Sequence, residues 1–308
     1  MNEGESTLTQ TLTCKDVIYA FSKDHAPVKH VEPGTTIEIE TYDCFENQVQ
    51  SAETKIAGID WDRINPATGP IFVNGAQPGD VLKVTINKLE IGSQGVMATG
   101  PDLGVMGHRL DELVSKIIPI EDGFALFNDK VKVPLNPMIG VIGVAPDDEP
   151  VSCGTPGAHG GNMDTKLITE GATLYFPVFA EGALFALGDF HAAMGDGEIG
   201  VSGIEVPGKA TVTLDIVKGT SLRHPVLVNE EGIAFIVSAA TLDEAVKTAV
   251  EEAIDFLLPH TDMTLAELTM LMSAAGDTQI SQVVDPLMTA RFFVPQYILN
   301  AYDVKPFA

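Results

Sequence analysis

The chain has 308 residues, of which 45% are hydrophobic and 20% charged, so it is long and apolar enough to fold around a large core. Asp and Glu outnumber Lys and Arg by 43 to 18, and the net charge of −25 repels phosphate groups, so we expect no nucleic-acid or membrane partner. Three cysteines without a paired spacing indicate neither a disulfide framework nor a thiolate zinc site, and an N-terminus without signal-peptide features predicts a cytoplasmic protein.

Apolar and polar residues alternate with a period of two after each of three Pro-Gly turns. This pattern predicts antiparallel strands within 33–43, 78–92 and 207–219, each with one buried face. The inward residues are expected to be Ile37, Ile39, Leu82, Val84, Ile86, Val212, Leu214 and Ile216. Residues 171–189 are typical of two strands joined at Glu181 and Gly182, and we expect a hairpin there.

The last quarter of the chain changes to a helical pattern. Thr241 opens a capping-box sequence, and the apolar residues that follow at helical spacing predict a helix that Pro259 stops. A second capping box opens at Thr264, and Gly276 is expected to end that helix. Residues 280–295 are expected to continue as a broken helix or loop between prolines.

Taken together, these patterns predict a β-rich α+β protein, with an antiparallel β-sandwich or barrel core and a C-terminal α+β part. We expect an N-terminal β-rich domain over 1–150, a central β segment with the active-site motif over 151–240, and a helical C-terminal part over 241–308 on the same core. Met270, Leu271 and Met272 leave apolar surface on the second helix, which makes a homodimer a further expectation.

The segment GDFHAAMGDGEIG, residues 188–200, concentrates ionisable side chains between small residues. It holds Asp189, His191, Asp196 and Glu198, and Glu205 follows shortly after. In an extended chain, Asp189 and His191 point to the same face, which suits either a divalent metal ion or a general base oriented by an acid. A polar loop with a satisfied histidine is the simpler alternative, but five titratable groups this close together favour a functional site.

Two other segments offer site residues. The glycine-rich loop 154–166 holds His159, Asn162 and Asp164, and its backbone N–H groups are suited to a substrate oxyanion, although an ordinary surface loop would have the same composition. Asp43 follows a predicted strand and is a third candidate. Cys153, close to His159, is an alternative nucleophile.

These segments resemble the acetamidase/formamidase family. The residues that carry the resemblance are the central stretch GNMDTKLITEGATLYFPVFAEGALFALGDFHAAMGDGEIGVSGIEV, together with TYDCFENQV, INPATGPIFVNGAQPGDVLKVTI and SAAGDTQISQVVDP in the same order. The similarity runs from about residue 17 to about residue 295, and the central stretch is the most specific part. Met194 departs from the polar residue that many relatives carry there, which bears on substrate preference.

The resemblance implies hydrolysis of short linear amides, of the formamide or acetamide type, to a carboxylate and ammonia. It also implies a small amide substrate and a divalent metal cofactor, with zinc as the first expectation and calcium as the alternative. The family's acidic and histidine positions fall on Asp189, His191, Asp196, Glu198, Glu205, His159, Asn162 and Asp164.

Our hypothesis assigns each of these residues a role. The metal ligands are Asp189 and His191, with His159 or Glu205 completing the set. Glu198, or else Asp196, is the catalytic acid and base. Asn162, Asp164 and Asp43 are assigned to the substrate or its oxyanion. Two alternatives stay open: a metal-free amidase that uses Cys153 with Lys166 and a glutamate, and a calcium-stabilised β protein that binds a ligand without catalysis.

Overall fold

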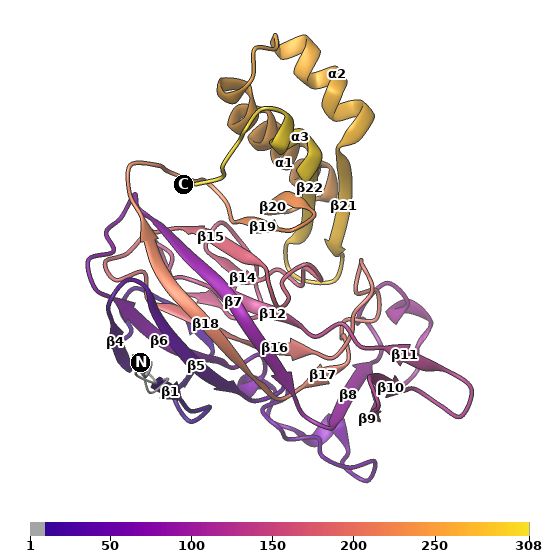
Figure 1. Cartoon of the computed structure of the whole chain (residues 1–308). Helices are drawn as coiled ribbons and strands as arrows, with labels where there is room; N and C mark the ends of the chain where they lie inside the picture. The colour runs from indigo at the N-terminus through magenta and orange to yellow at the C-terminus, as the bar shows by residue number, and fades with distance from the viewer. Residues whose placement is uncertain (1–9, 308) are drawn as a thin grey trace, which may run out of the picture.

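The structure is a computed structural model that describes residues 10–307, and it consists of two large β-sheets with helices at one end (Figure 1). All strand pairs in the described residues are antiparallel except β1 with β5 and β4 with β6. The predicted β-rich α+β fold with antiparallel sheets is therefore confirmed.

One sheet has nine strands. In spatial order they are β1 (Gln10–Leu12), β5 (Thr35–Thr41), β18 (Gly208–Val217), β7 (Val81–Ile91), β15 (Thr173–Pro177), β19 (Val226–Asn229), β20 (Gly232–Ala239), β22 (Met288–Pro295) and β21 (Asp277–Gln282). The three strands predicted after Pro-Gly turns are β5, β7 and β18, and they lie side by side. Their expected inward residues are fully buried, with Ile216 partly buried. The period-two pattern identified them because only one face of each strand meets the core.

The other large sheet has eleven strands. Eight form a path, in the order β11 (Lys132–Pro134), β10 (Phe124–Leu126), β9 (Val114–Glu121), β8 (Gln94–Thr99), β17 (Glu205–Val206), β16 (Phe185–His191), β12 (Met138–Gly143) and β14 (Gly160–Asn162). Beside this path, β6 (Ala67–Val73) pairs with β16, β2 (Val17–Ile18) and β4 (Lys29–Val31). A separate pair joins β3 (Ala20–Phe21) to β13 (Val151–Ser152).

The hairpin predicted around Glu181 and Gly182 is wrong. The two strands exist as β15 and β16, but β15 belongs to the nine-stranded sheet and β16 to the eleven-stranded sheet. Both edges of β15 are taken by β7 and β19, so β16 has no edge to pair with. The connection instead crosses between the sheets through Gly182, Ala183 and Leu184, all of which have positive φ.

The two predicted C-terminal helices are confirmed as α1 (Leu242–Leu257) and α2 (Leu265–Ala275), followed by a short α3 (Gln296–Ala301). The Thr264 capping box is complete, and Gly276 is the C-cap of α2. Four 3-10 helices complete the described structure: η1 (Ile56–Gly58), η2 (Trp61–Arg63), η3 (Gly107–Arg109) and η4 (Leu258–His260). On α2, Met272 is buried, whereas Met270 is 63% exposed.

The broken helix or loop predicted for 280–295 is wrong, because this segment forms the end of β21 and all of β22. β22 pairs with β20 along its whole length, from Met288 opposite Ala239 to Pro295 opposite Gly232. Its β-branched and aromatic residues suit a strand. Pro286 lies between the two strands and Pro295 ends β22, so the prolines bound a strand instead of interrupting a helix.

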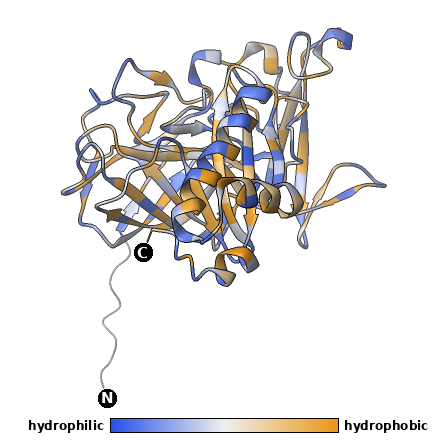
Figure 2. Cartoon of the chain, turned by 90° about the horizontal axis from the view of Figure 1, so that it is seen from above, coloured by the Kyte–Doolittle hydropathy of each residue, from blue (hydrophilic) through white to orange (hydrophobic). Residues whose placement is uncertain are grey.

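The two largest apolar cores follow from this arrangement. The larger lies between the two sheets and includes residues of β5, β7, β18, β12 and β16. The second lies where α1, α2 and α3 cover the β19 to β22 end of the nine-stranded sheet. Figure 2 shows apolar residues concentrated in the strands, with hydrophilic stretches along the helices. Within residues 10–307, no helix combines the length and apolar composition needed to cross a bilayer.

Candidate active site

The candidate site lies at the end of β16, in the interior of the eleven-stranded sheet. All seven residues of β16 are buried, because β12 pairs on one side and β6, then β17, pair on the other. Asp189 and His191 sit near the end of this strand, and the register of β17 places Glu205 directly opposite His191. From His191 Nε2 the distances are 3.2 Å to Glu205 Oε2, 3.5 Å to Asp189 Oδ1 and 3.7 Å to Asp164 Oδ1.

Two groups of potential ligand atoms lie here, and His191 belongs to one of them and contacts the carboxylates of the other. Asp164, His191 and Glu198 each offer an atom within 4.8 Å of the others, and Cys44, Asp189 and Glu205 form a second such group. Both groups are buried and could hold a metal ion. The acidic residues Asp164, Asp189 and Glu198 have φ values of 40°, 56° and 42°, in the left-handed region that side chains rarely adopt. Backbone strain of this kind is typical of functional sites.

Two glycines make this crowding sterically possible. A Cβ added at Gly140 would lie 2.4 Å from Asp164 Oδ1 and 2.5 Å from Asp189 Oδ2, so only glycine on β12 lets these two carboxylates meet. A Cβ at Gly203 would lie 2.4 Å from His191 Nδ1. The positions that pack against the site are therefore kept free of side chains.

The cluster carries more buried negative charge than its own residues neutralise. Within residues 10–307, no Lys or Arg forms an ion pair with Asp164, Asp189, Glu198 or Glu205. Eight buried polar atoms have no hydrogen-bond partner among the described residues: His159 Nε2, Asn162 Oδ1, Asp164 Oδ1 and Oδ2, Asp189 Oδ1, His191 Nδ1 and Nε2, and Glu205 Oε2. A buried carboxylate without a partner costs roughly several kcal/mol of folding free energy unless a cation or a proton compensates its charge.

The pKa shifts describe the same imbalance. Burial raises the pKa of Asp164 and Glu198 well above the ordinary range and that of Glu205 to about 8. Burial works against the charged form of His191, but the carboxylates of Glu205 and Asp189 outweigh it and raise the histidine pKa well above its usual value. Although burial favours the neutral form of Asp189, the neighbouring His191 holds its pKa below the ordinary value.

Asp196 does not join the cluster, although it lies in the same segment as Glu198. Both of its carboxylate oxygens accept hydrogen bonds from Arg291 Nη2, each at 2.9 Å, and Lys166 Nζ lies 3.0 Å away. Arg291 is 1% exposed, and it also donates to Gln279 Oε1 and Ser281 Oγ. The loop is further tied to β21 by a hydrogen bond from Gly197 N to Ser281 O. Asp196 thus anchors the loop that carries Glu198.

His159 and Asp43 also lie outside both ligand groups. His159 packs edge-on against Phe21, and burial lowers its pKa to about 4. Asp43 Oδ1 accepts hydrogen bonds from the backbone of Phe45 and Asn47, so its carboxylate closes a turn. Burial raises the pKa of Asp43 to about 6.

The structure adds two residues that sequence reasoning missed. Cys44 approaches Asp189 and Glu205, and Asp285 accepts a hydrogen bond from Asn162 Nδ2 at 3.1 Å. Burial and the nearby carboxylates raise the pKa of Asp285 well above its ordinary value. Both residues lie in stretches that resemble the family, since Cys44 follows Asp43 and Asp285 precedes Pro286. The family resemblance could therefore have indicated them, but their spacing from other polar residues could not.

Cys153 occupies an apolar setting. Its thiol is fully buried beside Phe21, Val141 and Ala186, and Sγ donates to Ile18 O at 3.5 Å. Burial raises the pKa of this thiol, which disfavours the nucleophilic thiolate. Lys166, the other member of that alternative, is paired with Asp196.

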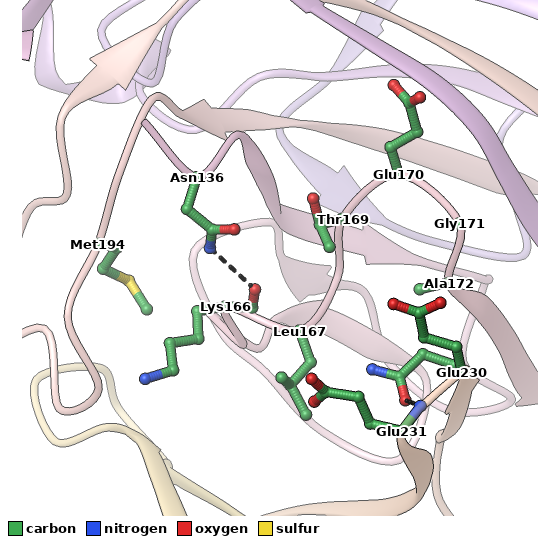
Figure 3. A pocket seen from close by; sticks show the side chains of 11 residues that line it. Asn136, Lys166, Leu167, Thr169, Glu170, Gly171, Ala172, Met194, Glu230 and Glu231 are labelled. Carbon is green, nitrogen blue, oxygen red and sulfur yellow. Dashed lines mark hydrogen bonds between the residues drawn. The ribbon is translucent and has the colours of Figure 1, made fainter. Parts of the chain in front are cut away.

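A solvent-connected cavity of about 670 Å³ lies beside the site (Figure 3). Lys166, Met194 and the glutamates Glu170, Glu230 and Glu231 are among its lining residues, and Asn136 donates a hydrogen bond to the backbone carbonyl of Lys166. No member of the two ligand groups lines this cavity, so it is not the reaction site.

Known proteins share the sequence pattern and the fold of this chain. The family model described as the Acetamidase/Formamidase family matches residues 15–154 and 151–301. A crystal structure of a recombinant predicted acetamidase/formamidase from Thermoanaerobacter tengcongensis is 53% identical, with a TM-score of 0.94 over 96% of this chain and 99% of that one. A crystal structure of an acetamidase from Bacillus halodurans is 42% identical, with a TM-score of 0.92 over 95% and 99%.

A formamidase from Methylophilus methylotrophus is 24% identical over 90% of this chain and 87% of its own length. The family match covers almost all of the described residues, including every member of the ligand groups. The chain therefore belongs to the acetamidase/formamidase family and is an amide hydrolase of that family.

Proposed function

We propose that this protein hydrolyses linear primary amides of the formamide or acetamide type in a reaction that depends on a divalent metal ion. The observation that carries the proposal is the excess of buried carboxylates around His191, with oxygen and nitrogen atoms that have no hydrogen-bond partner. Relatives described as formamidase and acetamidase support the substrate class.

The donor set fits a divalent ion. His191, Asp189, Glu205 and Asp164 would hold it, since their ligand atoms converge and are buried. The imidazole at the centre of the set favours zinc over calcium, which prefers oxygen ligands. This chemistry also argues against the alternative of a calcium-stabilised protein without catalysis.

When bound, the ion would polarise the amide carbonyl and lower the pKa of a nearby water molecule. Glu198 would accept a proton from the attacking water and pass it to the amide nitrogen. The water oxygen bonds to the carbonyl carbon, the C–N bond breaks, and a carboxylate and ammonium leave. Asn162 Oδ1, which has no hydrogen-bond partner within residues 10–307, would accept a hydrogen bond from the substrate N–H and orient the amide, while Nδ2 donates to Asp285.

The test is ammonia release from formamide and acetamide by purified protein, before and after chelation and after addition of zinc, manganese or calcium. We expect activity to disappear on chelation and to return with one metal. Glu198→Gln should keep the bound metal and lower kcat about 10²–10⁴-fold, the usual scale for a lost acid–base group. His191→Ala should lower the metal content itself, measured by elemental analysis.

Glu230→Gln is the matched control, because Glu230 is exposed and lines the neighbouring cavity instead of the cluster. It should retain full activity and metal content. Full activity in Glu198→Gln, or loss of metal from it, would remove the proton-transfer role from Glu198. Activity that survives chelation would refute metal dependence.

A further inference from the structure

An apolar cavity of about 570 Å³ opens directly beside the candidate site. Glu198 and Gly203 line it, and Gly203 is the residue whose missing side chain leaves room for His191. Most of the remaining lining is apolar or small, and it includes Met97, Phe127 and Ile204. The cavity therefore reaches Glu198, the residue that would transfer the proton.

A second apolar cavity, of about 400 Å³, extends this space along β8 and β9. It shares Met97, Phe127 and Ile199 with the first cavity, and Met106 and Val114 also line it. Large apolar side chains are left partly in water here, with Phe127 37% exposed and Ile199 59% exposed. We call the two joined cavities the apolar groove. Figure 1 places its strands, β8 to β11, on the side of the molecule that projects away from the helices.

The apolar groove is much larger than formamide or acetamide. Cavities of about 300–1,000 Å³ ordinarily enclose ligands of drug size, whereas formamide and acetamide have only three and four non-hydrogen atoms. A substrate that consists of little more than the amide group would leave Met97 and Phe127 without a contact. Apolar surface beside a reaction site is stabilised when an apolar part of the ligand covers it.

We propose that the apolar groove binds the acyl chain of the substrate, so that the preferred substrates are unbranched primary amides with acyl chains longer than that of propionamide. This inference rests on the proposed amide hydrolysis and specifies its substrate class. The amide group lies at Glu198, and the hydrocarbon chain runs past Met97 towards Phe127.

The experiment compares kcat/KM for ammonia release from acetamide, butyramide, hexanamide and octanamide with the metal-loaded protein. Each buried methylene group contributes about fourfold in kcat/KM at full burial. Because the groove is partly open, we expect a rise of at least about tenfold from acetamide to hexanamide, with KM falling along the series. Met97→Trp should lower kcat/KM for hexanamide at least fivefold more than for acetamide, because Met97 lines both cavities.

Met270→Trp is the matched control, because Met270 lies exposed on α2. This variant should leave the hexanamide-to-acetamide ratio of kcat/KM unchanged. The acyl-chain site would be overturned, while amide hydrolysis stands, if kcat/KM falls from acetamide to hexanamide. It would also be overturned if Met97→Trp leaves the hexanamide-to-acetamide ratio of kcat/KM unchanged. If no amide releases ammonia, the proposed function fails, and calorimetry then tests whether the apolar groove binds an acyl chain. Tighter binding of hexanamide than of acetamide, with the difference lost in Met97→Trp, supports the acyl-chain site. Equal binding of the two amides overturns it.

Discussion

Replacing Asp196 with alanine should destabilise the protein more than replacing its partner Arg291 with methionine. The guanidinium of Arg291 is 1% exposed, whereas the carboxylate of Asp196 is 30% exposed and also contacts Lys166. Removal of the acid leaves a charge buried without its partner, and burial already lowers the pKa of Arg291. Removal of one partner of a fully buried pair costs about 3–5 kcal/mol, and the exposure of Asp196 reduces the expected value to about 2–3 kcal/mol.

Arg291→Met removes the buried charge itself and leaves Asp196 with Lys166 and water. It should cost about 1–2 kcal/mol, mainly from the acceptors at Gln279 and Ser281 that lose their donor. The double variant should then be about 1 kcal/mol more stable than Asp196→Ala alone. Urea unfolding followed by circular dichroism at saturating metal measures these free energies.

Asp255→Ala provides a matched control, because the Asp255–Arg223 pair is 71% and 65% exposed and should be worth less than about 1 kcal/mol. If the double variant is less stable than Asp196→Ala, the unpaired charge of Arg291 is not what destabilises Asp196→Ala. The buried guanidinium would then be stabilised by its other hydrogen bonds without the carboxylate. The same variants test catalysis: per folded molecule, Asp196→Ala should keep activity within about tenfold, far above Glu198→Gln.

Two further substitutions test the steric and chemical setting of the site. Gly140→Ala should weaken metal binding at least tenfold in a competition titration, because the new Cβ would lie 2.4 Å from Asp164 Oδ1; Gly58→Ala, where nothing lies within 4 Å, should not. Unchanged affinity in Gly140→Ala would show that these carboxylates are not held together by the glycine. Cys153→Ala should retain ammonia release within about twofold and lose about 1 kcal/mol of stability, and complete inactivation of well-folded protein would restore the thiol mechanism.

The strands that sequence patterns predicted are those whose one buried face is imposed by the core between the sheets. Ile37 and Val84 alternate with polar residues because only their side meets that core. The errors concern pairing, which no local pattern records. The segments before and after Gly182 are strands whose partners are distant in the chain. Pro286 and Pro295 predict the limits of a helix or loop but bound the strand β22 instead.

Local sequence patterns also predict only part of the candidate site. The spacing of Asp189 and His191 was visible because they lie on one strand, although Asp189 departs from extended geometry. Glu205 reaches His191 through the register of β17, and Asp285 comes from the turn between β21 and β22. Asp196 and Glu198 are equivalent in the sequence, but Arg291, almost 100 residues later, takes only Asp196. Such distinctions depend on which distant segments the topology brings together.

The position of β18 in the nine-stranded sheet bears on the chain while it is still being synthesised. β18 lies between β5 and β7, yet it is translated after both of them. The ribosome adds about 5–20 residues per second, so β7 waits about 6–23 s, and β5 about 8–33 s, for the strand that separates them. During that interval their facing edges carry unpaired N–H and C=O groups, which are templates for pairing with another chain. A chaperone that shields exposed strand edges at the ribosome exit would protect this protein when it is most prone to aggregate.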